Sequence, residues 1–196
     1  MEYTVVTLSP RGAAVEEQDR RERILAAARA ALERHEYEQI QMRDVAQGAG
    51  VALGTLYRCF SSKEHLYAAV LLDWLTDVGR APAAGVRARA HAVIAACQRR
   101  PQFYKAHVAL QSSADPNARA LLTASGQVAR AALAAEVAGL GPARADDAAT
   151  MLWALITSRL SQAIYRGGDL GEIHRIADAF VDLLAPRRRG EQADRS

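Results

Sequence analysis

Apolar residues recur at helical spacing along most of this 196-residue sequence. The first periodic run begins at Asp19, and Ile24, Ala28 and Ala31 share one stripe of it. Residues 1–17 show no such period. We therefore expect a disordered arm over residues 1–17 and a first helix that starts near Asp19.

Shorter helices follow the first one. Met42–Gly48 has the pattern of a short helix, and Gly50 permits a tight turn before another short helix over residues 52–59. Ser61 or Ser62 suits the N-cap of the next helix, because a serine hydroxyl accepts a hydrogen bond from the first helical turn. The pattern therefore predicts three helices in quick succession.

Proline and glycine divide the rest of the chain into helical segments. Pro101 starts a helix, and Asp115 suits the N-cap of another that has Pro116 in its first turn, whereas residues 139–142 and 167–169 each stop one helix and start another. The expected segments are 84–99, 102–113, 116–138, 143–166 and 169–185. No run alternates like a strand, so the expected fold class is all-α. The polar tail, residues 187–196, is expected to be disordered.

The composition is typical of a soluble globular protein, with 50% hydrophobic and 24% charged residues. No stretch approaches the roughly 18 uninterrupted apolar residues of a membrane span, and the start of the chain lacks the regions of a signal peptide. Cys59 and Cys97 are too few for a disulfide framework and too isolated for a zinc site. We expect a cytoplasmic protein without a metal or cofactor.

Arginine dominates the basic residues. The net charge is +3, and only Lys63 and Lys105 among the 25 basic residues are lysines, which leaves 23 arginines. Arginine binds phosphates and guanine edges in a bidentate manner better than lysine does. Genome composition would produce the same bias, so composition alone leaves a nucleic-acid partner open.

The glycines at 48, 50 and 54 admit two interpretations. A dinucleotide-binding loop needs a strand before its glycines, whereas a helix precedes these. Two short helices joined at Gly50, with Val45 and Leu56 in a small shared core, instead form a helix-turn-helix. Small residues at the start of its second helix would let that helix enter a DNA major groove about 12 Å wide.

The stretch MRDVAQGAGVALGTLYRCFSSKEHL, residues 42–66, resembles the DNA-binding region of the TetR family of transcriptional regulators. The resemblance extends over about Arg20–Leu75, and beyond it only length and helical rhythm match. It implies a homodimeric, ligand-responsive repressor rather than an enzyme. A helix-turn-helix DNA-binding domain is then expected over residues 18–62, and a ligand-binding and dimerisation domain over residues 63–186.

The resemblance also implies which residues contact a double-stranded DNA operator. Base edges are expected near Leu53, Gly54 and Thr55, and sugar and phosphate groups near Tyr57 and Arg58. Because Leu53 and Gly54 have no hydrogen-bonding side chain, we expect thymine methyl contacts and DNA shape to carry more of the specificity. The full set of expected DNA-binding residues is Arg43, Ala52, Leu53, Gly54, Thr55, Tyr57, Arg58 and Lys63.

Three positions depart from the family pattern. Many members have Thr where this chain has Gln41 and Ser where it has Ala52, so we expect two weakly capped helices. Members often have His or an aromatic residue where this chain has Cys59, which puts one phosphate contact in doubt.

Charge in the expected DNA-binding region is local rather than general. Residues 1–63 contain nine basic and nine acidic residues, so their net charge is zero. DNA affinity is therefore expected to come from a patch of Arg43, Arg58 and Lys63, with Arg20 or Arg21 beside it.

Polar and aromatic side chains are scattered among the alanines and leucines of the C-terminal helices. Small-molecule pockets are mostly apolar with a few polar groups, so these side chains suit an effector site. Ordinary core and surface packing is the alternative. The candidate effector-binding residues are Tyr104, His107, Gln111, Trp153 and Thr157.

The last two expected helices have broad apolar faces that suit a dimeric four-helix bundle. Because amphipathicity does not identify the partner, packing within the chain is the alternative. Dimerisation would set two recognition helices about 34–36 Å apart, to match a palindromic operator. The candidate interface residues are Leu152, Ile156, Leu160, Ile164, Ile173, Ile176, Phe180 and Leu184.

Residues 41–60 also resemble the subgroup that represses sterol and cholesterol breakdown, through Met42, Ala52 and Gly54. This resemblance implies a small hydrophobic effector such as an acyl or steroid coenzyme A thioester. Arginines at the mouth of the pocket would then bind its phosphates.

Other functional classes have less support. The five histidines include no pair at metal-ligand spacing, and no nucleophile motif is present, which argues against an enzyme. A redox-sensing regulator that uses Cys59 is one alternative, although free cysteines are more often small buried hydrophobic residues. A ligand-independent architectural DNA-binding protein is another, and it would discriminate little between DNA sequences.

Overall fold

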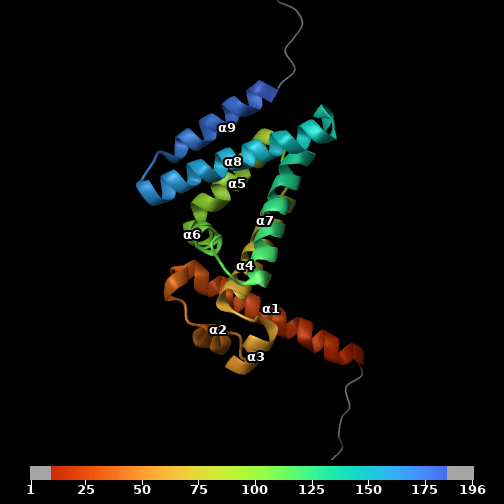
Figure 1. The fold of residues 1–196 in the computed structure, drawn as a ribbon, viewed down its shortest axis with the longest axis vertical. Helices are drawn as coiled ribbons and strands as arrows, with labels where there is room; N and C mark the ends of the chain where they lie inside the picture. The colour runs from red at the N-terminus through yellow and green to blue at the C-terminus, as the bar shows by residue number, and fades with distance from the viewer. Residues whose placement is uncertain (1–9, 185–196) are drawn as a thin grey trace, which may run out of the picture. The chain divides into compact units, whose positions relative to one another are not determined.

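The computed structural model describes residues 10–184, and over this range the backbone forms only helices and loops (Figure 1). The all-α prediction is therefore confirmed for this part of the chain. Within the same range, no helix combines the length and apolarity that crossing a bilayer requires. The elements in chain order are α1 (Pro10–Arg34), η1 (Tyr37–Gln39), α2 (Met42–Gly48), α3 (Leu53–Cys59), α4 (Lys63–Arg80), α5 (Val86–Arg99), α6 (Pro101–Leu110), α7 (Pro116–Ala135), η2 (Ala138–Leu140), α8 (Pro142–Arg166) and α9 (Leu170–Leu184).

The chain divides into two compact units. The N-terminal unit joins the residues up to Trp74 to Gln102–Ser125, and the C-terminal unit joins Leu75–Pro101 to the residues from Gly126 onward. This division differs from the predicted boundary after residue 62, because α4 belongs to the N-terminal unit as far as Trp74, and Leu66 and Leu71 are fully buried there.

Helix α1 begins nine residues before the predicted start at Asp19. Residues 14–19 are exposed, so this turn and a half of helix has no buried face, and hydrophobic spacing could not reveal it. Ile24 and Ala28 are fully buried, as their stripe predicts. The expectation of a disordered arm is thus wrong for residues 10–17, while residues 1–9 and the predicted tail 187–196 lie outside the described residues.

Helices α2 and α3 share a small core at the turn between them. Val45 and Leu56 expose 2% and 0% of their surface, as the sequence predicts. Gly50 adopts φ +64, and the Val51 N–H donates to the Ala46 carbonyl at 3.0 Å, which closes the turn. The helix-turn-helix is therefore present, and the bounds of α2 agree with the prediction.

Helix capping in the N-terminal unit also follows the sequence. Ser62 Oγ accepts the His65 N–H at 2.9 Å at the start of α4, and Asp115 Oδ1 accepts the Ala118 N–H at 3.0 Å at the start of α7. Gln41 and Ala52 make no side-chain capping bond, as their departure from the family pattern predicts. The two recognition-motif helices consequently depend on packing more than on caps.

In the C-terminal unit, α9 packs against α5 and α8. Polar groups reinforce the α5–α9 contact: Asp178 accepts from Arg87 at 2.8 Å and pairs with His91 at 2.7 Å. Arg89, also on α5, is a buried residue with 7% of its surface exposed, and its guanidinium donates to the carbonyls of Val78 and Ala81 and to Glu136. The end of α4 is therefore held by a buried charge.

Replacing Gly50 by alanine tests the turn. An added Cβ would meet no other atom within 4 Å, so only the left-handed backbone conformation opposes it. We expect the free energy of unfolding to fall by about 1–2 kcal/mol in urea denaturation. Gly50→Asn should lose less, because asparagine tolerates this conformation better. An unchanged value for Gly50→Ala would contradict the assigned turn.

Candidate nucleic-acid interface

Helix α3 has one buried side and a broad exposed side. Leu56 points into the core with no exposed surface, whereas Leu53 and Tyr57 are 40% and 46% exposed although both are large and hydrophobic. Arg58 is exposed, and Thr55 is partly exposed. All the α3 residues predicted to face DNA except Thr55 are therefore open to solvent, as are Ala52 and Gly54 at the helix start.

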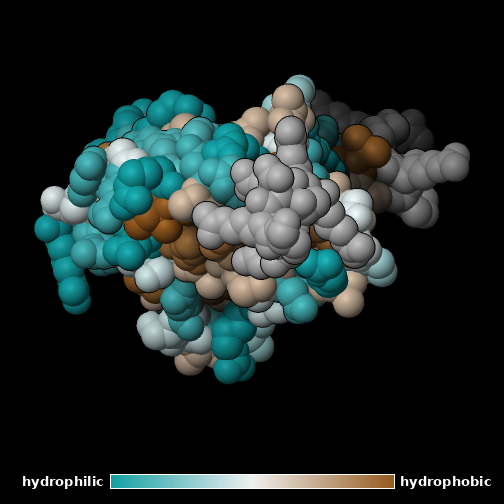
Figure 2. Space-filling view, turned by 90° about the horizontal axis from the view of Figure 1, so that it is seen from above, coloured by the Kyte–Doolittle hydropathy of each residue, from teal (hydrophilic) through white to brown (hydrophobic). Residues whose placement is uncertain are grey.

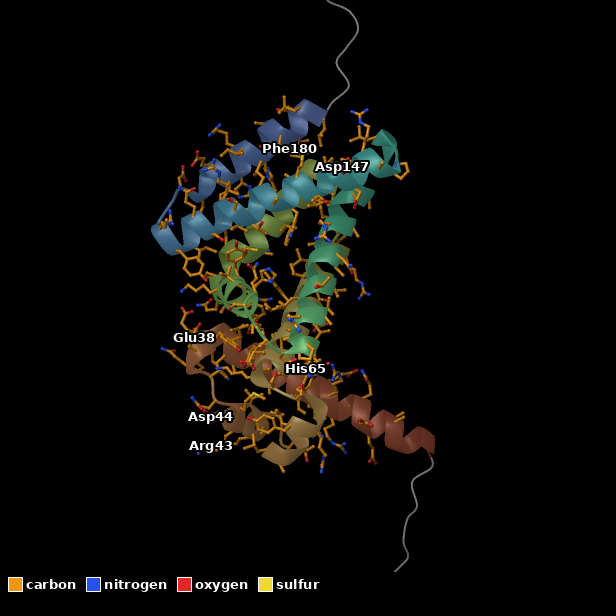
Figure 3. The ribbon with its side chains drawn as sticks, viewed as in Figure 1. Glu38, Arg43, Asp44, His65, Asp147 and Phe180 are labelled. Carbon is orange, nitrogen blue, oxygen red and sulfur yellow. The ribbon has the colours of Figure 1, made fainter. Side chains whose placement is uncertain are left out.

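Arginine side chains flank this exposed side. Arg58 Nη2 donates to Thr55 Oγ1 at 2.8 Å, which directs the guanidinium along the outer face of α3. On α2, the Arg43 side chain is 82% exposed, and its Nε lies 3.8 Å from Asp44 Oδ1 (Figure 3). Such a weak surface contact contributes little, so Arg43 can leave it for a phosphate.

Lys63, in the first turn of α4, is held in place by its own chain. Its ammonium lies 4.4 Å from the centre of the Tyr37 ring, and Nζ donates to the Glu38 carbonyl at 3.4 Å. Partial burial lowers the pKa of Lys63, although Glu38 and Glu64 act in the opposite direction. The predicted phosphate ligand is thus a pre-positioned cation beside a helix N-terminus, where N–H groups without an intrahelical partner favour anions.

Arg21 has a structural role that sequence reasoning missed. Its guanidinium lies 4.3 Å from the centre of the Phe60 ring, and Nη1 donates to the Cys59 carbonyl at 3.2 Å. Arg21 therefore fixes the end of α3. Cys59, on which the redox alternative rests, is partly buried at that end. The link between α3 and α1 runs through the Cys59 backbone carbonyl, so the type of side chain at residue 59 gives no signal of it.

The predicted effector residues fall in both units. Tyr104, His107 and Gln111 belong to the N-terminal unit, and Trp153 and Thr157 to the C-terminal unit. Tyr104 is 5% exposed and its ring centre lies 6.4 Å from that of His107. Burial lowers the pKa of His107, whose buried Nδ1 has no hydrogen-bond partner. The effector site stays a prediction.

Four of the predicted dimer residues are buried within one chain: Leu152, Ile156, Leu160 and Ile173 expose 2% or less. They have almost no surface to offer a partner, so for them packing within the chain is the correct alternative.

Other hydrophobic residues of the C-terminal unit remain accessible. Ile164, Ile176, Phe180 and Leu184 are partly exposed. Sequence reasoning missed Met151, Tyr165 and Leu183, which are 53%, 51% and 83% exposed. Figure 2 shows hydrophobic side chains gathered near the middle of one face, among hydrophilic ones. Large apolar side chains on the outer side of an amphipathic helix were the signal that could have found them.

Short, nearly uncapped helices around a small core, with an exposed second helix beside the N-terminus of a third, define a helix-turn-helix protein of the DNA-binding class. The family described as bacterial regulatory proteins, tetR family, matches residues 24–70. Over these residues the chain is similar to the TetR family.

Sequence similarity to individual proteins is confined to the same region. The transcriptional repressor KstR of Mycolicibacterium smegmatis is 51% identical over 55 residues, which are 28% of this chain and 27% of the repressor. KstR of Rhodococcus jostii gives the same identity over 26% of its length. The matched segment thus spans only about a quarter of the length of these relatives.

Similarity in fold extends along most of the chain. A TetR transcriptional regulator from Rhodococcus sp. RHA1 superposes with a TM-score of 0.72 and 26% identity, over 84% of this chain and 96% of that one. BioQ, solved with its double-stranded DNA operator, superposes with a TM-score of 0.58 and 23% identity, over 84% of this chain and 97% of that one. The proteins that this chain resembles are transcriptional regulators and not enzymes.

The substitution Gly54→Ala adds a methyl group to the exposed side of α3 and should change stability and DNA affinity in opposite directions. Gly54 is helical, and an added Cβ would meet no atom within 4 Å. Gly54→Ala should therefore stabilise the protein by up to about 1 kcal/mol. On DNA the same methyl would obstruct close approach, and we expect affinity to fall about tenfold in fluorescence anisotropy. Gly139→Ala, equally open but in η2, should leave DNA affinity unchanged.

Proposed function

We propose that this protein is a transcriptional repressor that binds a palindromic DNA operator as a homodimer and is released by a small hydrophobic effector. The exposed side of α3 is the observation that carries this proposal. A helix that exposes Leu53 and Tyr57 while burying Leu56 has large apolar surface that its own unit does not cover. Such surface is typical of an interaction site.

In the proposed complex, α3 enters the major groove. Leu53 and Gly54 contact base edges and thymine methyls, while Thr55 supplies a hydroxyl. Tyr57 and Arg58 bind sugar and phosphate groups. These contacts leave few base-specific hydrogen bonds, so the shape of the DNA contributes to specificity.

Phosphate contacts hold this helix in register. Arg43 on α2 and Lys63 on α4 flank α3 and would bind the DNA backbone on either side. The tie of Lys63 to Tyr37 and Glu38 supports this role, because a cation already ordered in the free protein loses less conformational entropy on binding. The similarity to KstR lies in the same region, which favours a related DNA target.

The proposed dimer uses the outer faces of α8 and α9. Met151, Tyr165 and Leu183 join the partly exposed Ile164, Ile176, Phe180 and Leu184 on these two helices. Two helices from each protomer would then form a four-helix bundle. The two copies of α3 would read half-sites one DNA turn apart.

The proposed effector is a small hydrophobic molecule, such as an acyl or steroid coenzyme A thioester. The buried Tyr104 and the partly exposed His107 beside it support a ligand site in the N-terminal unit, because the buried, unpaired His107 Nδ1 offers a polar group among apolar ones. Thermal-shift assays with acyl thioesters, steroids and aromatic acids would identify the chemical class.

Salt dependence of DNA binding tests the proposed phosphate contacts. A duplex selected from a random pool would be titrated with the protein by fluorescence anisotropy between 50 and 200 mM salt. With roughly 6–10 phosphate contacts per dimer, we expect affinity to fall about 10³–10⁵-fold over this range. Tyr57→Ala should bind more weakly at every salt concentration without a change in melting temperature. A flat salt response would contradict the proposed contacts, and equal affinity for all duplexes would favour an architectural protein.

Charge placed on the outer face of α8 tests the dimer. Met151→Glu would bury an unpaired carboxylate in the proposed interface, so we expect the dimer dissociation constant to rise at least about tenfold in sedimentation velocity. Val15→Glu is the matched control, because Val15 is also an exposed hydrophobic residue but lies on α1. Equal effects of the two substitutions would argue against this interface.

A further inference from the structure

Within the N-terminal unit, a single carboxylate connects the starts of α4 and α7. Asp115 Oδ1 accepts the N–H groups of Asn117 and Ala118 at 2.8 and 3.0 Å, which caps α7. Its other oxygen, Oδ2, accepts from Ser62 Oγ at 2.6 Å. Fifty-three residues separate Asp115 from Ser62, so this is a tertiary contact and not part of a local turn.

Ser62 is itself the cap of α4. Its hydroxyl oxygen accepts the His65 N–H at 2.9 Å while its proton is donated to Asp115. The hydroxyl therefore has a defined orientation. The hydrogen bond from Ser62 is the main cause that lowers the pKa of Asp115, with the N–H of Ala118 next, so the carboxylate is ionised at neutral pH.

A second pair of contacts lies beside the first. Asn117 Nδ2 donates to Ser61 Oγ at 3.2 Å, and the Ser61 N–H donates to His65 Nδ1 at 3.2 Å. Burial lowers the pKa of His65, which favours the neutral ring that can accept this N–H. We call Ser61, Ser62, Asp115 and Asn117 the clasp. It connects the residues just before α4 with the residues at the start of α7.

The clasp lies directly next to the proposed phosphate site. Ser62 immediately precedes Lys63, and the first N–H groups of α4 are those that would meet the DNA backbone. Because Ser62 also caps the helix, the clasp fixes the position of the first turn of α4 relative to the start of α7. A carboxylate near this site also repels phosphate, so the electrostatic effect of removing it opposes the effect of lost positioning.

We infer that Asp115 is a positioning residue for DNA binding: through Ser62, it holds the N-terminus of α4 and Lys63 where they meet the DNA backbone. This inference rests on the proposed function. The two effects of removing Asp115 have opposite signs: loss of positioning weakens DNA binding, whereas loss of charge repulsion strengthens it. Weaker binding therefore indicates positioning.

The substitution Asp115→Ser should break the bond to Ser62 while keeping the N-cap of α7. Serine is as good an N-cap as aspartate, so α7 keeps its cap, but the shorter side chain cannot also reach Ser62. Asp115→Asn keeps the cap and retains a weaker, uncharged hydrogen bond to Ser62. Asp73→Asn is the matched control, because it removes a carboxylate of the same unit that pairs with Arg29 and not with the clasp.

Binding of these full-length variants to the selected duplex, and to an unrelated duplex, would be measured by fluorescence anisotropy. We expect Asp115→Ser to weaken both affinities about tenfold and Asp115→Asn about threefold, because charge-assisted hydrogen bonds are roughly twice as strong as neutral ones. Asp73→Asn should change neither affinity more than about twofold. The ratio of the two affinities should stay constant, because phosphate contacts carry no sequence information.

A double-mutant cycle distinguishes positioning from a general loss of structure. In a Lys63→Ala background, Asp115→Ser should weaken binding less than about threefold, whereas in an Arg43→Ala background the full effect should persist. If Asp115→Ser lowers the melting temperature strongly, Asp115→Asn takes its place in the same cycle, and its threefold effect should disappear in the Lys63→Ala background and persist in the Arg43→Ala background.

Tighter or unchanged binding by Asp115→Ser, or equal losses in both backgrounds, would overturn the inference while leaving the proposed function intact. Failure of the wild-type protein to prefer any duplex would instead overturn the proposed function.

Discussion

Burial of Leu56 determines which side of α3 faces solvent. The helix has seven residues and no side-chain N-cap, so it is too short to be stable alone. Its rotation about its own axis is set by the one side chain that enters the core shared with α2. With Leu56 inward, Leu53, Tyr57 and Arg58 face outward. Sequence specificity in the proposed complex thus depends on an apolar contact that never touches DNA.

Distant parts of the chain stabilise this arrangement. Arg21 of α1 holds the end of α3, and the clasp holds the start of α4 to the start of α7. On α6, Lys105 pairs with Glu36 at 2.8 Å, and the Phe103 ring lies 5.2 Å from that of Trp74. The N-terminal unit is therefore more than a three-helix DNA-binding domain, because residues 102–125 take part in its packing and its polar network.

Local features were predictable from the sequence because their causes are local. The bounds of α2, the turn at Gly50, and the caps at Ser62 and Asp115 follow from residue type and neighbouring residues. The early start of α1 was not predictable, because its first turns bury nothing. The intramolecular burial of Leu152 was also out of reach, since an apolar stripe does not reveal whether its partner lies in the same chain. Ser62 was one of two candidate caps and Asp115 a predicted cap, yet only the tertiary structure shows that these two residues are joined by a hydrogen bond.

Arg89 bears on the abundance of arginine in this protein. Its guanidinium reaches three acceptors that belong to the end of α4, the residue after it and the segment that follows α7. A lysine ammonium has a single nitrogen and could not span all three in this fixed planar arrangement. At this position the choice of arginine is therefore dictated by geometry, whatever nucleotide bias shaped the rest of the composition. Replacement of this one arginine by lysine would therefore remove contacts that hold the end of α4, even in a chain with many other arginines.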